Sequence, residues 1–208
     1  KEDINALYIK GTKMIAMITV PIAVMVIVHA EHIVSFWMGR TDMADAATAT
    51  RFLIIGITSY LIVGVGRMIA RGIGIPHYEM QAGILIGISN FILSYIMIVK
   101  WGLFGAVIAS SSTLSMGSIF FLVRFNRKMG LPQKWIFKML VNISLFSGIS
   151  ALSSLVIPSF YNIYFIGGMS LRMQAFAYLL SVFMISAIVY TFLIFTSGIL
   201  KENIKPVH

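Results

Sequence analysis

"RFLIIGITSYLIVGVGRMIAR", residues 51–71, carries no charge between Arg51 and Arg67. A helix needs about 20 predominantly apolar residues to cross the hydrocarbon core of a bilayer. The stretch has that length and composition. It therefore predicts one membrane-spanning helix that ends in two arginines, Arg67 and Arg71.

The composition of the whole chain supports the same class. Hydrophobic residues make up 59% of the sequence and charged residues only 11%, and the mean hydropathy is +0.93. Soluble domains carry about 25% charged residues. The apolar runs are continuous and do not alternate with polar residues, which excludes membrane-spanning strands. We therefore expect an all-α polytopic membrane protein.

The spacing of apolar runs, prolines and glycines predicts six membrane-spanning helices. Pro21 is expected to bend the first, Trp101-Gly102 to form a tight turn between the third and fourth, and Pro158 to end the fifth. The six expected helices cover about residues 13–37, 51–71, 79–99, 103–125, 134–157 and 173–199.

The loop charges predict an orientation. Of the 16 Lys and Arg residues, twelve fall on the side of the predicted bundle that holds the N-terminus. Positive residues accumulate on the cytoplasmic side of a membrane, so we expect both termini of this segment in the cytoplasm and the chain in the plasma membrane. The net charge of +9 does not indicate a nucleic-acid partner, because no pattern of interleaved aromatic and basic residues accompanies it.

Arg67 and Arg71 lie four residues apart and so share one face of a helix. One interpretation is that both side chains extend to the cytoplasmic surface and anchor the helix end. The other concerns Arg67, which lies about one turn deeper. A charge at that depth usually faces the bundle interior or a wet cavity, where a guanidinium suits a phosphate group.

Two further residues are candidates for a polar path. Asn90 is in the middle of the third predicted helix, and Ser112 belongs to "SSSTLS", residues 110–115, in the fourth. They either contact a substrate or form hydrogen bonds within and between helices.

"HAEH", residues 29–32, gathers His29, Glu31 and His32 near the outer end of the first predicted helix. Histidine titrates near neutral pH, so the cluster could couple ion movement to transport. The alternative is an interfacial cap beside Trp37. The spacing does not place all three side chains on one helical face, so we expect no metal site. Nothing in the sequence indicates a cofactor, and the absence of cysteine excludes thiolate ligands.

Four features, taken in order, make the chain resemble a known family. They are Pro21 in the first helix, the Phe36-Trp37-x-Gly39 exit, "ARGIGIP" at 70–76 and "GLFGAVIA" at 102–109. Together they resemble the C-terminal half of polysaccharide (lipid-linked oligosaccharide) flippases of the multidrug/oligosaccharidyl-lipid/polysaccharide exporter superfamily. The resemblance covers about residues 3–128, and the last two helices agree in position and hydrophobicity.

The resemblance implies the last six helices of a fourteen-helix transporter with two lobes. Residues 1–128 would then complete the second lobe, and residues 129–208 would add two appended helices. It also implies that polyprenyl-phosphate-linked sugar crosses the membrane by alternating access, with membrane lipid and the N-terminal half of the same chain as partners. Since residue 1 is Lys, we expect this chain to be a fragment or a processed form.

Three alternatives remain open at the level of sequence. A cation-coupled multidrug exporter of the same superfamily predicts carboxylates deep in the membrane. A membrane enzyme of polyprenyl-sugar metabolism predicts acidic residues or histidines on one face, whereas a flippase makes and breaks no bond and is not an enzyme. A scaffold predicts helices with no transport path.

Overall fold

The computed structural model describes residues 2–40, 42–155 and 171–197, and these residues form helices and no strands. The helices are α1 (Glu2–Val28), α2 (Ala30–Met38), α3 (Ala44–Ile62), α4 (Gly64–Gly72), α5 (His77–Met129), α6 (Lys134–Ser154) and α8 (Leu171–Thr196).

Five helical stretches of the described chain are long and apolar enough to cross a membrane. The longest, His77–Met129, bends into two arms that each exceed the length needed for one crossing. Counting the arms separately, the helices match the six that the sequence predicts. The expectation of an all-α, multi-pass membrane protein is confirmed.

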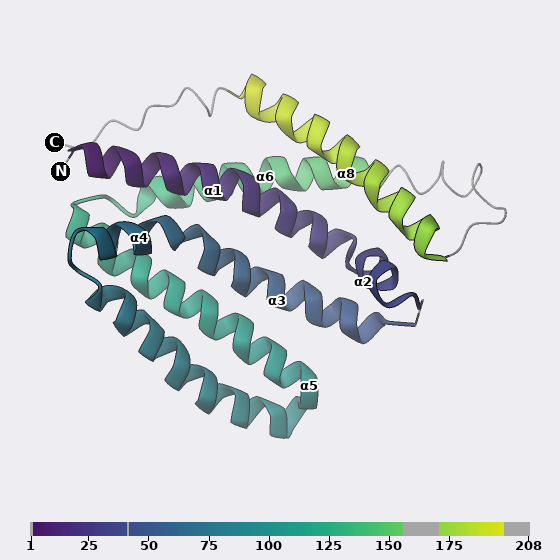
Figure 1. Ribbon diagram of the computed structural model, residues 1–208, viewed down its shortest axis with the longest axis horizontal. Helices are drawn as coiled ribbons and strands as arrows, with labels where there is room; N and C mark the ends of the chain where they lie inside the picture. The colour runs from purple at the N-terminus through teal and green to yellow at the C-terminus, as the bar shows by residue number, and fades with distance from the viewer. Residues whose placement is uncertain (1, 41, 156–170, 198–208) are drawn as a thin grey trace. The chain divides into compact units, whose positions relative to one another are not determined.

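The bend in α5 lies at Gly102, where the sequence predicts a turn. Its backbone has φ 56° and ψ −133°, a left-handed conformation that side chains with a Cβ rarely adopt. Three residues later, a Cβ on Gly105 would overlap the carbonyl of Met97. The two glycines therefore let α5 fold back on itself, as Figure 1 shows.

The observed helix bounds differ from the predicted ones at several points. The first helix begins at Glu2 instead of residue 13 and continues through Pro21, and its interruption falls at His29. The second begins at Ala44, seven residues before Arg51. The added segments pack on other helices: Tyr8 lies against Phe125, and Ala47 packs with Ala30 and Val34. Hydropathy does not report such contacts. The predicted ends at residues 157 and 199, and Pro158, lie outside the described residues.

The chain forms two compact units. Unit 1 comprises the described residues up to 19 together with 52–140, and unit 2 comprises 20–51 together with the described residues from 141 on. Within unit 1, α4 packs on α5. Within unit 2, α2 packs on α8.

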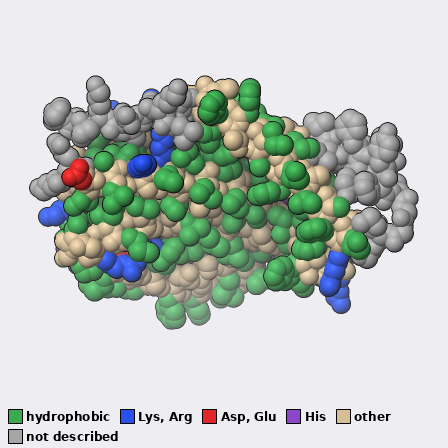
Figure 2. Space-filling view, turned by 45° about the horizontal axis from the view of Figure 1, so that its top comes forward, with side chains coloured by type: hydrophobic (Ala, Val, Ile, Leu, Met, Phe, Trp, Pro, Cys, Tyr) green, Lys and Arg blue, Asp and Glu red, His purple; other side chains and the backbone are tan. Residues whose placement is uncertain are grey.

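Apolar side chains face outward over most of the helical surface. Figure 2 shows hydrophobic side chains spread across the face in view, with few Lys and Arg side chains among them. Phe91 and Tyr95 in the first arm of α5 are 80% and 72% exposed. Because the aqueous surface of a soluble protein rarely exposes so large an apolar area, this surface suits contact with lipid.

A serine of α5 forms hydrogen bonds with two backbone groups of α3. The hydroxyl of Ser111 accepts a hydrogen bond from the backbone N–H of Gly56 at 3.1 Å and donates one to the carbonyl of Phe52 at 2.6 Å. In a regular helix that N–H and that carbonyl, four residues apart, bond to each other. A Cβ on Gly56 would lie 2.7 Å from the Cα of Ser111, so glycine is what allows this approach.

We expect Gly56→Ala to destabilise the protein by about 1–3 kcal/mol, because the added methyl group meets backbone that cannot move aside easily. Gly83→Ala is the matched control, since a Cβ on Gly83 meets no atom within 4 Å. That control should be neutral or stabilise by about 0.5–1 kcal/mol through helix propensity. Thermal unfolding in detergent measures both, and equal melting temperatures for the two variants would contradict the close α3–α5 contact.

Candidate functional site

Arg67 lies inside unit 1, on α4, and is only 4% exposed. Its guanidinium carbon stacks over the ring of Tyr60, 3.7 Å from the centroid, and lies 5.7 Å from the centroid of Phe121. A cation over an aromatic face is stabilised by about 0.5–2 kcal/mol. This stacking compensates only part of the cost of burying a charge.

The guanidinium has an edge without a partner. Within the described residues, neither Nε nor Nη2 of Arg67 has a hydrogen-bond partner, although both atoms are buried. These two nitrogens form one side of the guanidinium, where two N–H bonds point in parallel and match two oxygens of a phosphate or carboxylate. Buried polar groups in folded proteins are nearly always satisfied, so an unsatisfied edge of this shape is a candidate position for an anion.

The local sequence explains why Arg67 is buried here. The helix is interrupted at Val63, and α4 restarts at Gly64. A Cβ on Gly66 would lie 3.0 Å from the rings of both Phe121 and Tyr8, so this glycine lets the aromatic side chains close over the helix. Tyr8 is fixed in turn, because its hydroxyl donates a hydrogen bond of 2.9 Å to the Oδ1 of Asn126.

Arg71, one turn further along α4, has a different environment. Its side chain is 55% exposed, and its Nε lies 2.8 Å from the Oε2 of Glu79 in the first turn of α5. A second contact joins Nη2 of Arg71 to Oε1 of Glu79 at 3.2 Å. Arg71 is thus paired with a carboxylate, whereas Arg67 forms no salt bridge with any of the described residues. The helical spacing predicts that the two arginines share a face but does not predict this difference.

The two candidates for a polar path are in different environments. The Nδ2 of Asn90 lies 3.4 Å from Ser110 Oγ and 3.3 Å from Thr113 Oγ1, and its Oδ1 accepts a hydrogen bond from Ser94 at 2.8 Å. These contacts join the two arms of α5. Ser112 is exposed, and the structure does not bring it together with Arg67.

His29 occupies the break between α1 and α2 in unit 2 and is 2% exposed. Its Nε2 lies 2.8 Å from the Oγ of Ser154, and its Nδ1 lies 3.1 Å from the hydroxyl of Tyr178. Ser154 donates its own hydroxyl hydrogen to the carbonyl of Ala151 at 2.6 Å. The geometry therefore assigns the Nε2–H tautomer to neutral His29, with Nδ1 accepting from Tyr178.

The other two members of the predicted cluster point elsewhere. Glu31 is exposed and pairs with Arg51, whose Nη2 lies 3.0 Å from its Oε1. The exposed ring of His32 packs on Tyr178, with centroids 4.2 Å apart. The structure thus brings His29 and His32 together around Tyr178 but not Glu31. Within the described residues no group of three or more acidic, histidine or cysteine side chains could hold a metal ion.

Sequence reasoning missed Tyr60 and Tyr178. Tyr60 precedes Arg67 by seven residues, about two helical turns, and this spacing is a signal that could have paired them. Tyr178 lies 149 residues from His29, and no local pattern links the two.

Comparison with protein-family models, curated proteins and solved structures gave no match for this chain.

We expect His29→Leu to lower stability by about 1–3 kcal/mol, because it leaves the hydroxyl of Tyr178 and that of Ser154 without the imidazole. His32→Leu is the control on the same short helix segment and should cost less than about 1 kcal/mol, since His32 is exposed. Unfolding of the purified protein in detergent compares the two. Similar losses in both variants would show that the hydrogen bonds of His29 do not hold unit 2 together.

Proposed function

We propose that this chain is part of a flippase that moves a lipid-linked oligosaccharide across the plasma membrane, and that Arg67 binds the phosphate group of that lipid. The observation that carries the proposal is the buried, unpartnered Nε–Nη2 edge of Arg67. The order of sequence features that resembles polysaccharide flippases supports the same function.

The depth of Arg67 is consistent with this role. It lies five residues before the end of the span Ala44–Gly72, which corresponds to about 8 Å along a helix. A phosphate at that depth has left the headgroup region and entered the edge of the hydrocarbon core. A guanidinium binds a phosphate most strongly at such a depth, because water no longer competes for the hydrogen bonds.

The cost of burying an unpaired cation also favours a functional role. Ionisable residues inside membrane segments are rare and mark substrate or ion pathways. Arg71 is suited to anchor the helix end at the membrane surface, because it is exposed and paired with Glu79. Arg67 has no such pairing in the part of the chain that the structure describes, and it is not needed as a helix-end anchor.

In this proposal the site is closed in the conformation described. Because Arg67 is 4% exposed, the surrounding helices must separate before a phosphate reaches it, and alternating access provides that opening. The polyprenyl tail stays in the bilayer, no bond is made or broken, and both termini face the cytoplasm. The N-terminal half of the transporter supplies the other lobe.

The test is a transport assay with the complete protein in liposomes that contain a fluorescent polyprenyl-diphosphate sugar. Arg67→Lys keeps the positive charge but loses the paired N–H groups, so the transport rate should fall at least tenfold. A tenfold fall corresponds to about 1.4 kcal/mol of free energy. Arg71→Lys, which keeps a cation beside Glu79, should change transport less than about twofold.

Folding of each variant is checked by its melting temperature and its elution from a sizing column. Transport by a folded Arg67→Lys variant at the wild-type rate would refute the phosphate-binding role. Absence of any transport by the wild-type protein would favour a scaffold or an enzyme.

A further inference from the structure

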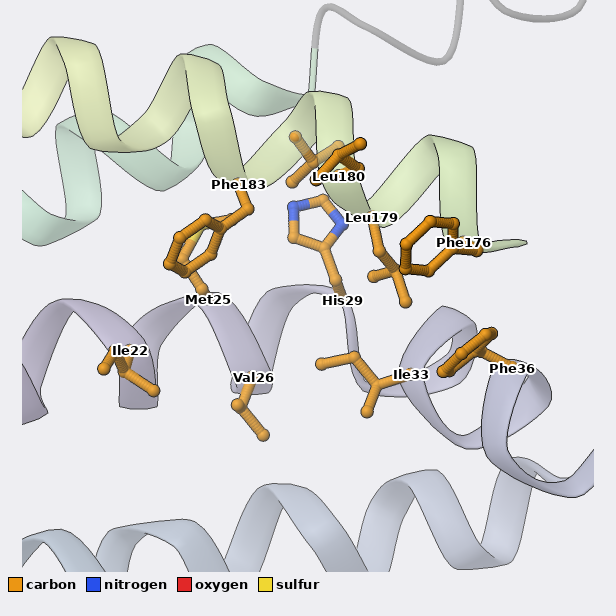
Figure 3. Close-up of a pocket in the computed structure, with 11 residues that line it drawn as sticks. Ile22, Met25, Val26, His29, Ile33, Phe36, Phe176, Leu179, Leu180 and Phe183 are labelled. Atoms are coloured by element: carbon orange, nitrogen blue, oxygen red, sulfur yellow. The ribbon is translucent and has the colours of Figure 1, made fainter. Parts of the chain in front are cut away.

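A groove runs along unit 2 between α8 and the α1–α2 segment. Its volume is about 320 Å³. Figure 3 shows His29 pointing from the break between α1 and α2 toward Leu179 and Leu180 of α8, with Phe36 and Phe176 at one end of the groove and Ile22 toward the other. Side chains far apart in the sequence thus form one continuous wall.

The lining of the groove favours a hydrocarbon. Ten of the eleven lining residues are apolar, and the exception is His29. Both ring nitrogens of His29 already face hydroxyl groups, those of Ser154 and Tyr178. The imidazole therefore presents no unsatisfied nitrogen to a ligand. A polar ligand would lose its hydrogen bonds to water here and gain none, whereas an acyl chain loses nothing.

The groove is open on one side. Ile22, Phe176, Leu180 and Phe183 line it and are about half exposed, whereas Val182 at its base is fully buried. In a membrane-embedded chain the open side faces lipid. The volume is at the lower end for ligand sites, about 300–1,000 Å³, and so fits one chain rather than a whole lipid.

A cation lies beyond the end of the groove that holds Phe36 and Phe176. Arg172 precedes Phe176 by four residues and so lies one turn away on the same face of α8. Its guanidinium packs against Gly39, where a Cβ would lie 2.6 Å from its Nε. Arg172 is exposed and forms no ion pair within the described part of the chain. Trp37, two residues before Gly39 in the sequence, is 79% exposed. An exposed cation beside an exposed tryptophan is typical of the headgroup level.

We propose that the groove binds one acyl chain of a phospholipid whose phosphate lies at Arg172. The apolar wall holds the chain, and Arg172 and Trp37 hold the headgroup at the membrane surface. The lipid then fills the space between α8 and the broken α1–α2 helix. This site lies in unit 2, is independent of the phosphate site at Arg67, and does not require that the protein be a flippase.

The test measures lipid that stays with the purified protein. The complete protein is reconstituted in bilayers of phosphatidylglycerol, phosphatidylethanolamine and polyprenyl phosphate, extracted into detergent and examined by native mass spectrometry. Leu180→Trp places a larger side chain at the rim of the groove and should lower phospholipid retention at least fivefold. Ile188→Trp, on the same helix at a 65% exposed position outside the groove, is the matched control and should retain as much lipid as wild type.

Arg172→Gln provides a second variant that leaves the groove intact. It should lower retention of phosphatidylglycerol several-fold, because the headgroup loses its cation. The proposal is supported if wild type keeps one diacyl phospholipid per chain and the two variants lose it. It is overturned if wild type keeps none, if Leu180→Trp and Ile188→Trp retain equal amounts, or if the retained lipid is polyprenyl phosphate.

Discussion

The guanidinium of Arg67, buried with no salt bridge to any residue that the structure describes, is the feature on which the proposed function depends. A charge in an apolar bundle is costly, and stacking on Tyr60 offsets only part of that cost. The elements around it are arranged to hold it there: the restart of the helix at Gly64, the glycine at position 66 that admits two aromatic rings, and the carboxylate of Glu79 that is already paired with Arg71. The proposed phosphate-binding role accounts for a cation that is buried with this edge vacant.

Hydrogen bonds between helices help to set which helix surfaces meet. Lipid is as apolar as leucine, so association of membrane helices relies on close packing and interhelical hydrogen bonds. Ser111 forms two hydrogen bonds with the backbone of α3, and Asn90 joins the two arms of α5. In unit 2, His29 at the break after α1 forms hydrogen bonds with Ser154 of α6 and Tyr178 of α8. Each of these groups is satisfied, which distinguishes them from Arg67.

The sequence predicts those parts of the fold that depend on local chemistry. The turn at Gly102 follows from the backbone freedom of glycine, and the helix count follows from apolar length. The depth of Arg67 in the predicted span can also be read from the local sequence, and it marks Arg67 as a candidate site residue. Partners distant in sequence are different: His29 meets Ser154 and Tyr178 across 125 and 149 residues. No local pattern encodes which helices become neighbours, so these contacts could not be predicted from the sequence and are seen only in the structure.

The most direct measurement is nitrogen-15 NMR of the arginine Nε–H groups during titration with geranyl diphosphate, with geraniol as the uncharged control. The Arg67 signal is assigned by its loss in Arg67→Lys. If the vacant edge binds phosphate, that signal shifts and saturates with geranyl diphosphate and stays in place with geraniol. A signal of Arg67 that does not move, or a shift confined to Arg71, would contradict the assignment of Arg67 as the phosphate site.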